Sequence, residues 1–248
     1  MVIKDEFLSN EKISEYEVEK VFDSKKNTVE LIKATKTNGN GVYYVHKILS
    51  NHKKMLKEIE LLNYLFEKGL DVPKVYYEDE ESFLIEYIEG ETLLEHITRL
   101  EKEQKEKFNY RSNNRLIYKF LNWIEKFYEL VKEKTGENII LEDMNLRNFI
   151  YADKLYGFDF EDCHVGKKER DIGRFCAFLL TYSFAFTNWK VRFTRQMLKA
   201  VEDYGYDLDL IREEIDKEFI SITKRRGTKI PRSLRDLILG RVFSFYNG

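Results

Sequence analysis

Cysteine and histidine are scarce in this sequence, and their scarcity excludes two common kinds of site. The chain of 248 residues has two cysteines, Cys163 and Cys176, and neither belongs to a Cys-x-x-Cys pair. A disulfide framework and a cysteine-based zinc site are therefore excluded, and a reduced, cytoplasmic setting is expected. The four histidines are scattered along the chain, which argues against a metal centre built from histidine.

Long apolar runs are also lacking. The longest, residues 175–186, has 12 residues, which is too short to cross a bilayer and predicts a buried helix instead. Residues 1–10 contain no apolar run, so no signal peptide is expected. The sequence therefore predicts a chain without a membrane span.

Neither sign of charge is in large excess. The net charge is −2, which provides no general attraction to nucleic acid or to an anionic membrane. Hydrophobic residues make up 43% and charged residues 35%, so a globular core is expected and extensive disorder is not. Nothing in the composition indicates an oligomeric state.

The first third of the chain has the pattern of an antiparallel sheet. Strands are expected over residues 15–22, 28–35 and 42–48, because β-forming residues alternate with polar ones there. The last two are joined by Lys-Thr-Asn-Gly-Asn-Gly, whose Asn-Gly step is typical of a tight hairpin. Two further strands are expected over residues 72–79 and 82–90, which gives a five-stranded antiparallel sheet.

One helix is expected within this region, over residues 51–68. Ser50 or Asn51 can cap its start, and Gly69 can end it. Five strands and one helix make a small α+β lobe, which we place at residues 1–88.

The remainder, residues 89–248, is expected to be a mostly helical lobe. Helical spacing of apolar residues covers 92–108 and 114–135, and the part after Asp171 is also mostly helical. A short polar hairpin is expected at 148–160. The predicted fold is therefore α+β with two lobes.

A polar stretch from Leu141 to Cys163 contains the strongest candidates for chemistry. Asp143 is followed after four residues by Asn148, and an apolar strand and a turn then lead to Asp159. Magnesium prefers hard oxygen ligands, which Asn148 and Asp159 can supply. Asp143 can accept the proton of a substrate hydroxyl. This order is that of a kinase catalytic loop, although a polar loop with a hairpin is the alternative.

Lys47 and Glu58 are a second candidate pair. Lys47 lies in the third expected strand, where its ammonium can contact nucleotide phosphates. On the following helix, Glu58 lies roughly 55° from the mean direction of the apolar face, and Glu60 lies roughly 145° from it. Glu58 is therefore predicted to reach inward to Lys47. The alternatives are an exposed strand lysine and an exposed glutamate.

Two further segments have weaker signals. The backbone of Glu86, Tyr87 and Ile88 can read an adenine edge where a strand enters a Gly-containing link, although ordinary strand-to-helix connections look the same. Asp171 begins a long apolar helix, where a carboxylate is favoured. It is predicted to cap that helix, to support the backbone of the Asp143 loop, or to do both.

Together these residues resemble the protein kinase-like fold, and within it the aminoglycoside phosphotransferase and choline kinase group. The resemblance covers most of the chain, and it implies ATP, with GTP left open, and magnesium. It also implies phosphate transfer to a hydroxyl of a small molecule, with residues 1–88 as the nucleotide-binding lobe and residues 89–248 as the catalytic and substrate-binding lobe. Asp143 would be the catalytic base, Asn148 and Asp159 the magnesium ligands, and Lys47 with Glu58 the pair that positions phosphates.

The sequence departs from this group in three places. Leu141 and Glu142 stand where His-Gly usually precedes the catalytic aspartate. The loop near residues 22–30 has no glycine, so nucleotide phosphates would meet backbone amides there with the help of Ser24, Asn27 or Thr28. Asp-Phe-Glu replaces Asp-Phe-Gly at residues 159–161.

The acceptor substrate is left open by the sequence. Residues 202–218 hold eight acidic and two basic residues, and residues 219–241 hold seven basic and one acidic. An acidic pocket would favour an aminoglycoside, an aminosugar or an amino alcohol, and a basic one an anionic substrate. Both runs can also be solvated helix faces. Two other functions remain as alternatives: nucleotide binding with little catalysis, and a kinase that acts on a protein or a glycan.

Overall fold

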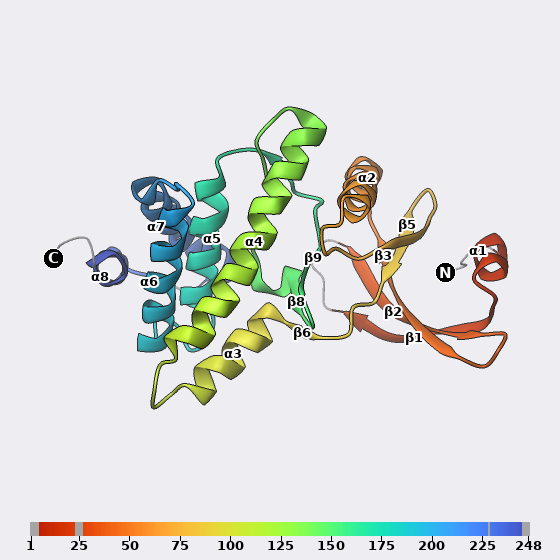
Figure 1. The fold of residues 1–248 in the computed structure, drawn as a ribbon, viewed down its shortest axis with the longest axis horizontal. Helices are drawn as coiled ribbons and strands as arrows, with labels where there is room; N and C mark the ends of the chain where they lie inside the picture. The colour runs from red at the N-terminus through yellow and green to blue at the C-terminus, as the bar shows by residue number, and fades with distance from the viewer. Residues whose placement is uncertain (1–4, 23–26, 228, 245–248) are drawn as a thin grey trace. The chain divides into compact units, whose positions relative to one another are not determined.

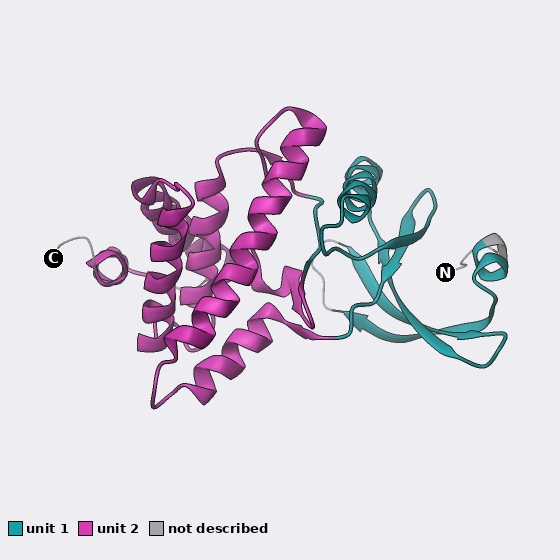
Figure 2. Cartoon of the chain, viewed as in Figure 1, with its two compact units in different colours: residues 1–89, 156–161 teal, residues 90–155, 162–248 magenta. Residues whose placement is uncertain are grey.

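The computed structural model describes residues 5–22, 27–227 and 229–244, and the chain is divided into two compact units. Unit 1 comprises residues 1–89 and 156–161, and unit 2 comprises residues 90–155 and 162–248 (Figure 2). The fold is α+β, as the sequence predicted.

Unit 1 is built on a five-stranded antiparallel sheet with the strand order β1-β2-β3-β5-β4 (Figure 1). All five expected strands are present. The elements of the unit are α1 (Asp5–Asn10), β1 (Ile13–Phe22), β2 (Thr28–Lys36), β3 (Gly41–Ile48), α2 (His52–Glu67), β4 (Val75–Glu78) and β5 (Ser82–Glu86).

The turn between β2 and β3 has the chemistry that the sequence indicated. Gly39 has a φ of 84°, a left-handed conformation that costs glycine little. Its N–H donates to the carbonyl of Lys36, and the N–H of Lys36 donates to the carbonyl of Asn40. This turn fixes the register in which Val29 lies opposite Lys47.

Helix α2 begins and ends close to the expected residues. The side chain of Asn51 accepts a hydrogen bond from the N–H of Lys54 at 3.1 Å, and Gly69 follows the helix with a φ of 72°. Its buried residues include Glu58 among the apolar ones, whereas Glu60 is exposed. The helix therefore turns one carboxylate inward.

Unit 1 contains a second helix that the sequence analysis did not predict. Helix α1 is six residues long, which is too short for the spacing of its apolar residues to indicate a helix. Its Phe7 is buried against Tyr44 on one face of the sheet, with ring centroids 5.7 Å apart. Ile32 and Leu84 belong to the same cluster, which leaves the opposite face of the sheet to Lys47.

Unit 2 is mostly helical. Helix α5 contacts both α6 and α7, and α4 contacts α6. The helices of the unit are α3 (Leu93–Glu103), α4 (Tyr110–Thr135), α5 (Lys168–Thr181), α6 (Asn188–Asp203), α7 (Leu208–Arg226) and α8 (Arg232–Phe243). Short elements frame the loop of interest: β6 (Glu91–Thr92), β7 (Ile139–Ile140), the 3-10 helix η1 (Leu146–Asn148), β8 (Phe149–Tyr151) and β10 (His164–Val165).

The boundary between the units differs from the expected division at residues 88 and 89. The chain leaves unit 1 after Glu89, and residues 156–161 belong to unit 1 although they follow β8 in the sequence. Strand β9 (Leu155–Gly157) contains the crossing. Two hydrogen bonds hold the returning segment: the N–H of Gly157 donates to the carbonyl of Asp71, and the N–H of Phe160 donates to Glu58.

The apolar run at residues 175–186 is only partly helical, which corrects the expectation of one buried helix. Helix α5 ends at Thr181, because Tyr182 has an extended backbone with a ψ of 152°. The helical part is buried, as expected, but Phe184 beyond it is 83% exposed. In the part of the chain that the structure describes, no helix combines the length and apolar character required to cross a membrane.

Candidate active site

Lys47, Glu58 and Asp159 form a compact charged cluster in unit 1, called the Lys47 cluster below. The Lys47 ammonium lies 2.7 and 3.0 Å from the two carboxylate oxygens of Glu58 and 2.8 Å from Oδ1 of Asp159. Lys47 and Glu58 are almost fully buried. Strand β3 supplies the cation, α2 supplies one carboxylate, and the segment that returns to unit 1 supplies the other.

Electrostatics keep Lys47 charged in this setting. Burial lowers the pKa of Lys47, but the carboxylates of Glu58 and Asp159 raise it by more, so the pKa lies above its ordinary value. One ammonium contacts two carboxylates. Burial raises the pKa of Glu58, although the charge of Lys47 lowers it.

Asp159 has an unusual backbone conformation. Its φ is 70°, in the left-handed region that residues other than glycine rarely adopt. The ion pair to Lys47 and the adjacent hydrogen bond from the Phe160 N–H to Glu58 at 3.3 Å maintain it. The Asp159 side chain is 29% exposed, so it can meet both the buried lysine and a ligand from solvent.

The chemistry of Asn148 and Asp159 suits magnesium, which takes few protein ligands and retains water. Within residues 5–22, 27–227 and 229–244, no group of three or more histidine, cysteine, aspartate or glutamate residues is arranged to hold a metal.

The residues expected to cover nucleotide phosphates are only partly described. Ser24 lies outside the described residues. Asn27 donates from Nδ2 to Oε2 of Glu161 at 3.0 Å, so its amide is oriented by the segment that also holds Asp159. Thr28 begins β2 opposite Ile48, next to the strand position of Lys47.

A cavity of about 540 Å³ lies in unit 1 where the chain leaves β5. Tyr43, Tyr76, Glu86 and Tyr87 are among the residues that line it. Its size is that of a small-molecule site, and the tyrosine rings offer stacking surfaces. The N–H of Glu86 already donates to the carbonyl of Lys74, so reading of an adenine edge would depend on the backbone after Glu86.

Asp143 and Asn148 lie together in unit 2, at the loop that follows β7. The Asn148 amide nitrogen donates to the Asp143 carbonyl at 3.2 Å, so the amide oxygen is the atom of this group that takes no part in that contact. Oδ1 of Asp143 accepts from the N–H of Asn145 at 3.2 Å. The short turn of η1 closes the spacing of four residues and brings the two side chains to one loop.

Asp171 supports this loop from α5. Its side chain is fully buried and accepts from the N–H groups of Leu141 at 2.8 Å and Glu142 at 3.0 Å. The hydroxyl of Tyr128 also donates to it at 2.9 Å. Burial raises the pKa of Asp171 to about 6, although these three hydrogen bonds lower it. Asp171 therefore anchors the backbone immediately before Asp143.

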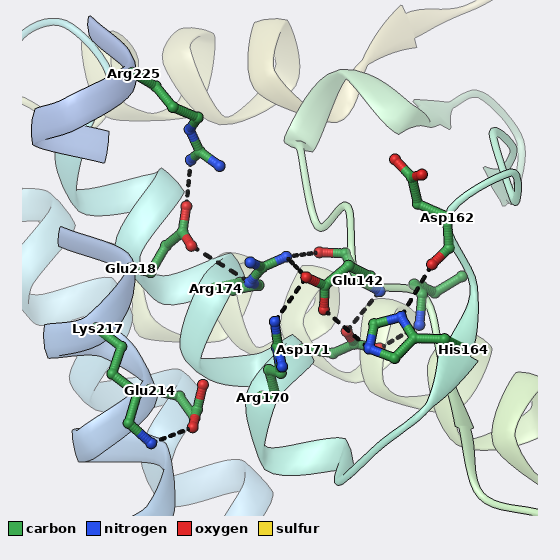
Figure 3. A network of polar contacts seen from close by, with 11 residues as sticks. Glu142, Asp162, His164, Arg170, Asp171, Arg174, Glu214, Lys217, Glu218 and Arg225 are labelled. Atoms are coloured by element: carbon green, nitrogen blue, oxygen red, sulfur yellow. Dashed lines mark hydrogen bonds and ion pairs between the residues drawn. The ribbon is translucent and has the colours of Figure 1, made fainter. Parts of the chain in front are cut away.

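Glu142 is the centre of a second charged cluster, which comprises Glu142, His164, Arg170 and Arg174 and is called the Glu142 cluster below (Figure 3). Oε1 of Glu142 lies 2.8 Å from Arg170 and 2.6 Å from Arg174, and Oε2 lies 3.6 Å from His164. Arg174 also donates to the Glu142 carbonyl at 2.5 Å. The same arginine lies 3.3 Å from Glu218 of α7.

The Glu142 cluster surrounds a residue whose backbone conformation favours glycine. Glu142 has a φ of 66°, a conformation that favours glycine. All three groups of Glu142 have partners on α5. Its carboxylate contacts Arg170 and Arg174, its N–H donates to Asp171, and its carbonyl accepts from Arg174. These contacts hold a strained residue in place directly before Asp143.

Sequence reasoning missed the arginines of this cluster. Arg170 and Arg174 are four residues apart in the first two turns of α5, with Asp171 between them. That spacing puts both on one helix face and could have indicated a partner carboxylate. Glu142 was noted only as a departure from the expected His-Gly.

The predicted site residues therefore fall into two sets. Unit 1 contains Lys47, Glu58 and Asp159 in contact, together with Asn27, Thr28 and the segment Glu86–Ile88, and unit 2 contains Asp143 and Asn148. Comparison with models of protein families and with curated proteins found no match to this chain.

Proposed function

We propose that the chain is an ATP- and magnesium-dependent phosphotransferase that transfers the terminal phosphate to a hydroxyl. The observation that carries this proposal is the buried Lys47 ammonium between Glu58 and Asp159. A charged lysine that is expensive to bury, with one partly exposed carboxylate beside it, suits the binding of phosphates together with a cation. The proposal includes the protein kinase-like fold, with unit 1 as the nucleotide-binding lobe and unit 2 as the catalytic lobe.

In the proposed mechanism, Lys47 neutralises and orients nucleotide phosphates, and Glu58 holds its ammonium in place. Asp159 and Asn148 would hold magnesium, which when bound neutralises phosphate oxygens and stabilises the charge that develops during transfer. The cavity beside Tyr87 would hold the nucleobase. Most of the rate acceleration would come from positioning and electrostatic stabilisation.

Asp143 performs the proton transfer in this mechanism. Its carboxylate orients the acceptor hydroxyl and takes its proton as the hydroxyl oxygen forms a bond to the terminal phosphorus. The bond from that phosphorus to the bridging oxygen breaks, and ADP leaves with the electron pair. The hydrogen bonds of Asp171 to the preceding backbone support the position of Asp143.

The test combines labelled ATP with a panel of hydroxyl compounds. Asp143→Asn is expected to reduce transfer about 10²- to 10⁴-fold, because general base catalysis is lost. ATP binding, measured as a magnesium-dependent rise in melting temperature, should change little. Asp153→Asn is the matched control, since Asp153 is an exposed aspartate of the same segment.

The outcomes separate the alternatives. Transfer at the wild-type rate in Asp143→Asn would remove Asp143 from the role of base. A thermal shift with ATP and magnesium, without transfer to any compound, would favour a nucleotide-binding protein with little catalysis. Label that enters the macromolecules of a lysate rather than its small molecules would indicate a protein or glycan acceptor. Competition between ATP and GTP in the thermal shift identifies the nucleotide.

A further inference from the structure

A cavity of about 600 Å³ lies in unit 2 between α6 and α8, two helices that contact each other (Figure 1). Its volume is in the range of sites for small molecules. None of the residues that line it belongs to the Lys47 cluster, to the Glu142 cluster or to the loop that carries Asp143. The proposed function therefore gives this cavity no role.

One face of α6 forms the first wall of the cavity. Its lining residues are Asn188, Val191, Arg192 and Arg195, whose spacing of three and four residues places them on the same side of the helix. Val191 is buried, whereas Arg192 is exposed and Arg195 is partly buried. The wall therefore combines an apolar contact with two guanidinium groups.

Helix α8 forms the second wall with Leu237, Gly240 and Arg241. Leu237 is 58% exposed, and Arg241 is partly buried. A Cβ added at Gly240 would meet no atom within 4 Å, so bare backbone borders open space at this point of the helix. A larger side chain at residue 240 would occupy that space.

The three arginines of the cavity donate to neutral oxygens. Nε of Arg195 donates to the carbonyl of Arg241 at 2.7 Å, and Nη2 of Arg241 donates to Oδ1 of Asn188 at 2.6 Å. Nη2 of Arg192 lies 3.0 Å from the hydroxyl oxygen of Tyr110. Because a guanidinium group has five N–H donors, each arginine keeps further donors for a ligand.

These three positive charges are not balanced locally. In the part of the chain that the structure describes, no carboxylate lies within ion-pair distance of Arg192, Arg195 or Arg241. Asp236 is the acidic residue of the lining, and its Oδ2 lies 3.8 Å from Arg232 of the same helix. The lining therefore has an excess of positive charge, which favours an anion.

Arg241 belongs to the basic run at residues 219–241, for which the sequence allowed either an anionic ligand or a solvated helix face. Other arginines of the run have carboxylate partners: Arg225 contacts Glu218, and Nε of Arg235 lies 2.6 Å from Asp216. Arg241 differs from them, because it lines a cavity and donates to an amide oxygen. Within this run, Arg241 is therefore the arginine best placed to meet a ligand.

Arg195 and Arg241 are held at different points of the cavity wall. The guanidinium of Arg195 is bonded to the backbone of Arg241, whereas the guanidinium of Arg241 extends to Asn188 in the first turn of α6. The long side chain of Arg241 separates these two points. A ligand that meets both arginines therefore needs more than one oxyanion group.

We propose that this cavity binds a small soluble organic molecule with two oxyanion groups, and that Arg195 and Arg241 each hold one of them. Guanidinium groups bind phosphate and carboxylate through paired hydrogen bonds, so both belong to the class of ligand. The part of the ligand between its charged groups would contact Leu237 and Val191. This inference does not rest on the proposed phosphotransferase function.

The experiment measures binding to the full chain by calorimetry, without ATP. The probes are fructose 1,6-bisphosphate, fructose 6-phosphate and fructose, which carry two, one and no phosphate groups, and the dicarboxylate suberate. The bisphosphate is expected to bind more tightly than the monophosphate, and fructose should not bind. Arg195→Gln/Arg241→Gln should weaken binding of the bisphosphate about 10- to 100-fold, as for loss of charged hydrogen bonds.

Gly240→Leu tests the same cavity without removal of a charge or of a hydrogen bond. The leucine side chain would occupy the open space beside residue 240, so binding of the bisphosphate should weaken here as well. The fold should be retained, because leucine is a better helix former than glycine. This variant separates loss of the site from loss of the fold, which circular dichroism and melting temperature check for every variant.

Lys132→Gln/Lys217→Gln is the matched control for charge. It removes two positive charges from exposed helix positions of unit 2 that do not line the cavity. Binding of the bisphosphate should stay within about twofold of wild type, since a general effect of net charge is weak at physiological salt. An equal loss in this control and in Arg195→Gln/Arg241→Gln would overturn the inference.

Three further results would overturn it. The first is binding of the bisphosphate and of suberate that is no tighter in wild type than in Arg195→Gln/Arg241→Gln. The second is equal affinity for the bisphosphate and the monophosphate, which would remove the need for two oxyanion groups. The third is binding to vesicles of phosphatidylcholine with phosphatidic acid in the absence of binding to any soluble probe, which would replace a soluble ligand by a lipid surface.

Discussion

The Lys47 cluster and the Glu142 cluster are built with opposite proportions of charge. The first has one cation, Lys47, between two carboxylates, whereas the second has one carboxylate, Glu142, between two arginines and a histidine. In unit 1 two carboxylates face one cation, and the carboxylate of Asp159 is partly exposed. In unit 2 the single carboxylate contacts two arginines through its Oε1 atom, and Glu142 directly precedes Asp143 in the chain. The comparison separates a cluster with a partly exposed carboxylate, Asp159, from one whose carboxylate is held by two arginines of α5.

Both clusters hold a residue at positive φ, Asp159 at 70° and Glu142 at 66°. Aspartate adopts this conformation more readily than glutamate, because its short side chain bonds the nearby backbone. Asp159 is held mainly through its side chain, and Glu142 through its side chain, N–H and carbonyl together. The more strained residue has the larger number of partners.

The largest effect is expected from Lys47→Met. Removal of the ammonium leaves Glu58 and Asp159 without their counterion, which should lower the free energy of unfolding by about 3 to 5 kcal/mol. Urea denaturation measures it, and phosphate transfer should be lost as well. Lys33→Met is the control, since Lys33 is an exposed strand lysine with a weak partner at 3.9 Å. Equal costs for the two substitutions would contradict a special role for the Lys47 cluster.

The contribution of Asp171, which accepts from the N–H of Glu142, to the free energy of unfolding should depend on pH. Because burial raises the pKa of Asp171 from 3.8 to about 6, the folded chain holds its proton more tightly than the unfolded chain does. The contribution of Asp171 to the free energy of unfolding therefore falls as the pH rises from about 4 to about 6, by roughly 3 kcal/mol. Asp171→Asn cannot titrate, so the difference in stability between wild type and this variant should change over that range. If the free energies of unfolding of wild type and Asp171→Asn changed in parallel with pH, the pKa of Asp171 would not be raised.

Gly173→Ala tests how closely α5 must approach α7 to join Arg174 to Glu218. A Cβ at residue 173 would lie 2.5 Å from the Cβ of Glu214, so the helices must separate. We expect a loss of about 1 to 3 kcal/mol, measured by thermal or urea unfolding. Gly240→Ala is the matched control, because a Cβ there meets no atom within 4 Å in α8. That substitution should be neutral or slightly stabilising, and equal losses at both positions would refute the close contact.

The smallest effect is expected from a comparison of two substitutions of Glu142, which measures the backbone strain at that residue. Glu142→Gly and Glu142→Ala both remove the carboxylate, but only glycine adopts a φ of 66° at little cost. The glycine variant should be more stable than the alanine variant by about 1 kcal/mol. Urea unfolding of the two variants side by side gives this difference directly. An alanine variant that is equally stable would mean that the loop relaxes once the ion pairs are gone.

The sequence was sufficient for features that depend on local pattern. The β-forming segments and the Asn-Gly turn indicated the five strands, and the apolar face of α2 distinguished Glu58 from Glu60. The spacing of Asp143 and Asn148 is closed by a single turn, so it too could be read locally.

Features that depend on residues far apart in the chain could not be predicted in this way. The segment with Asp159 belongs to unit 1 because of contacts to Asp71 and Glu58, about ninety to a hundred residues earlier. The place of Arg226 on the Tyr182 ring likewise depends on how α7 packs against α5. A repeat pattern identifies the buried side of a helix but not the neighbour that covers it.

The return of residues 156–161 to unit 1 has a consequence for synthesis on the ribosome. When residue 89 has emerged, all five strands of the sheet and α2 are available, but the second carboxylate partner of Lys47 has not been made. About seventy further residues must be translated before Asp159 and Phe160 can join Lys47 and Glu58. The nascent sheet therefore has an incomplete ion pair network until much of unit 2 has also left the exit tunnel, and a fragment that ends at residue 89 would keep that defect permanently.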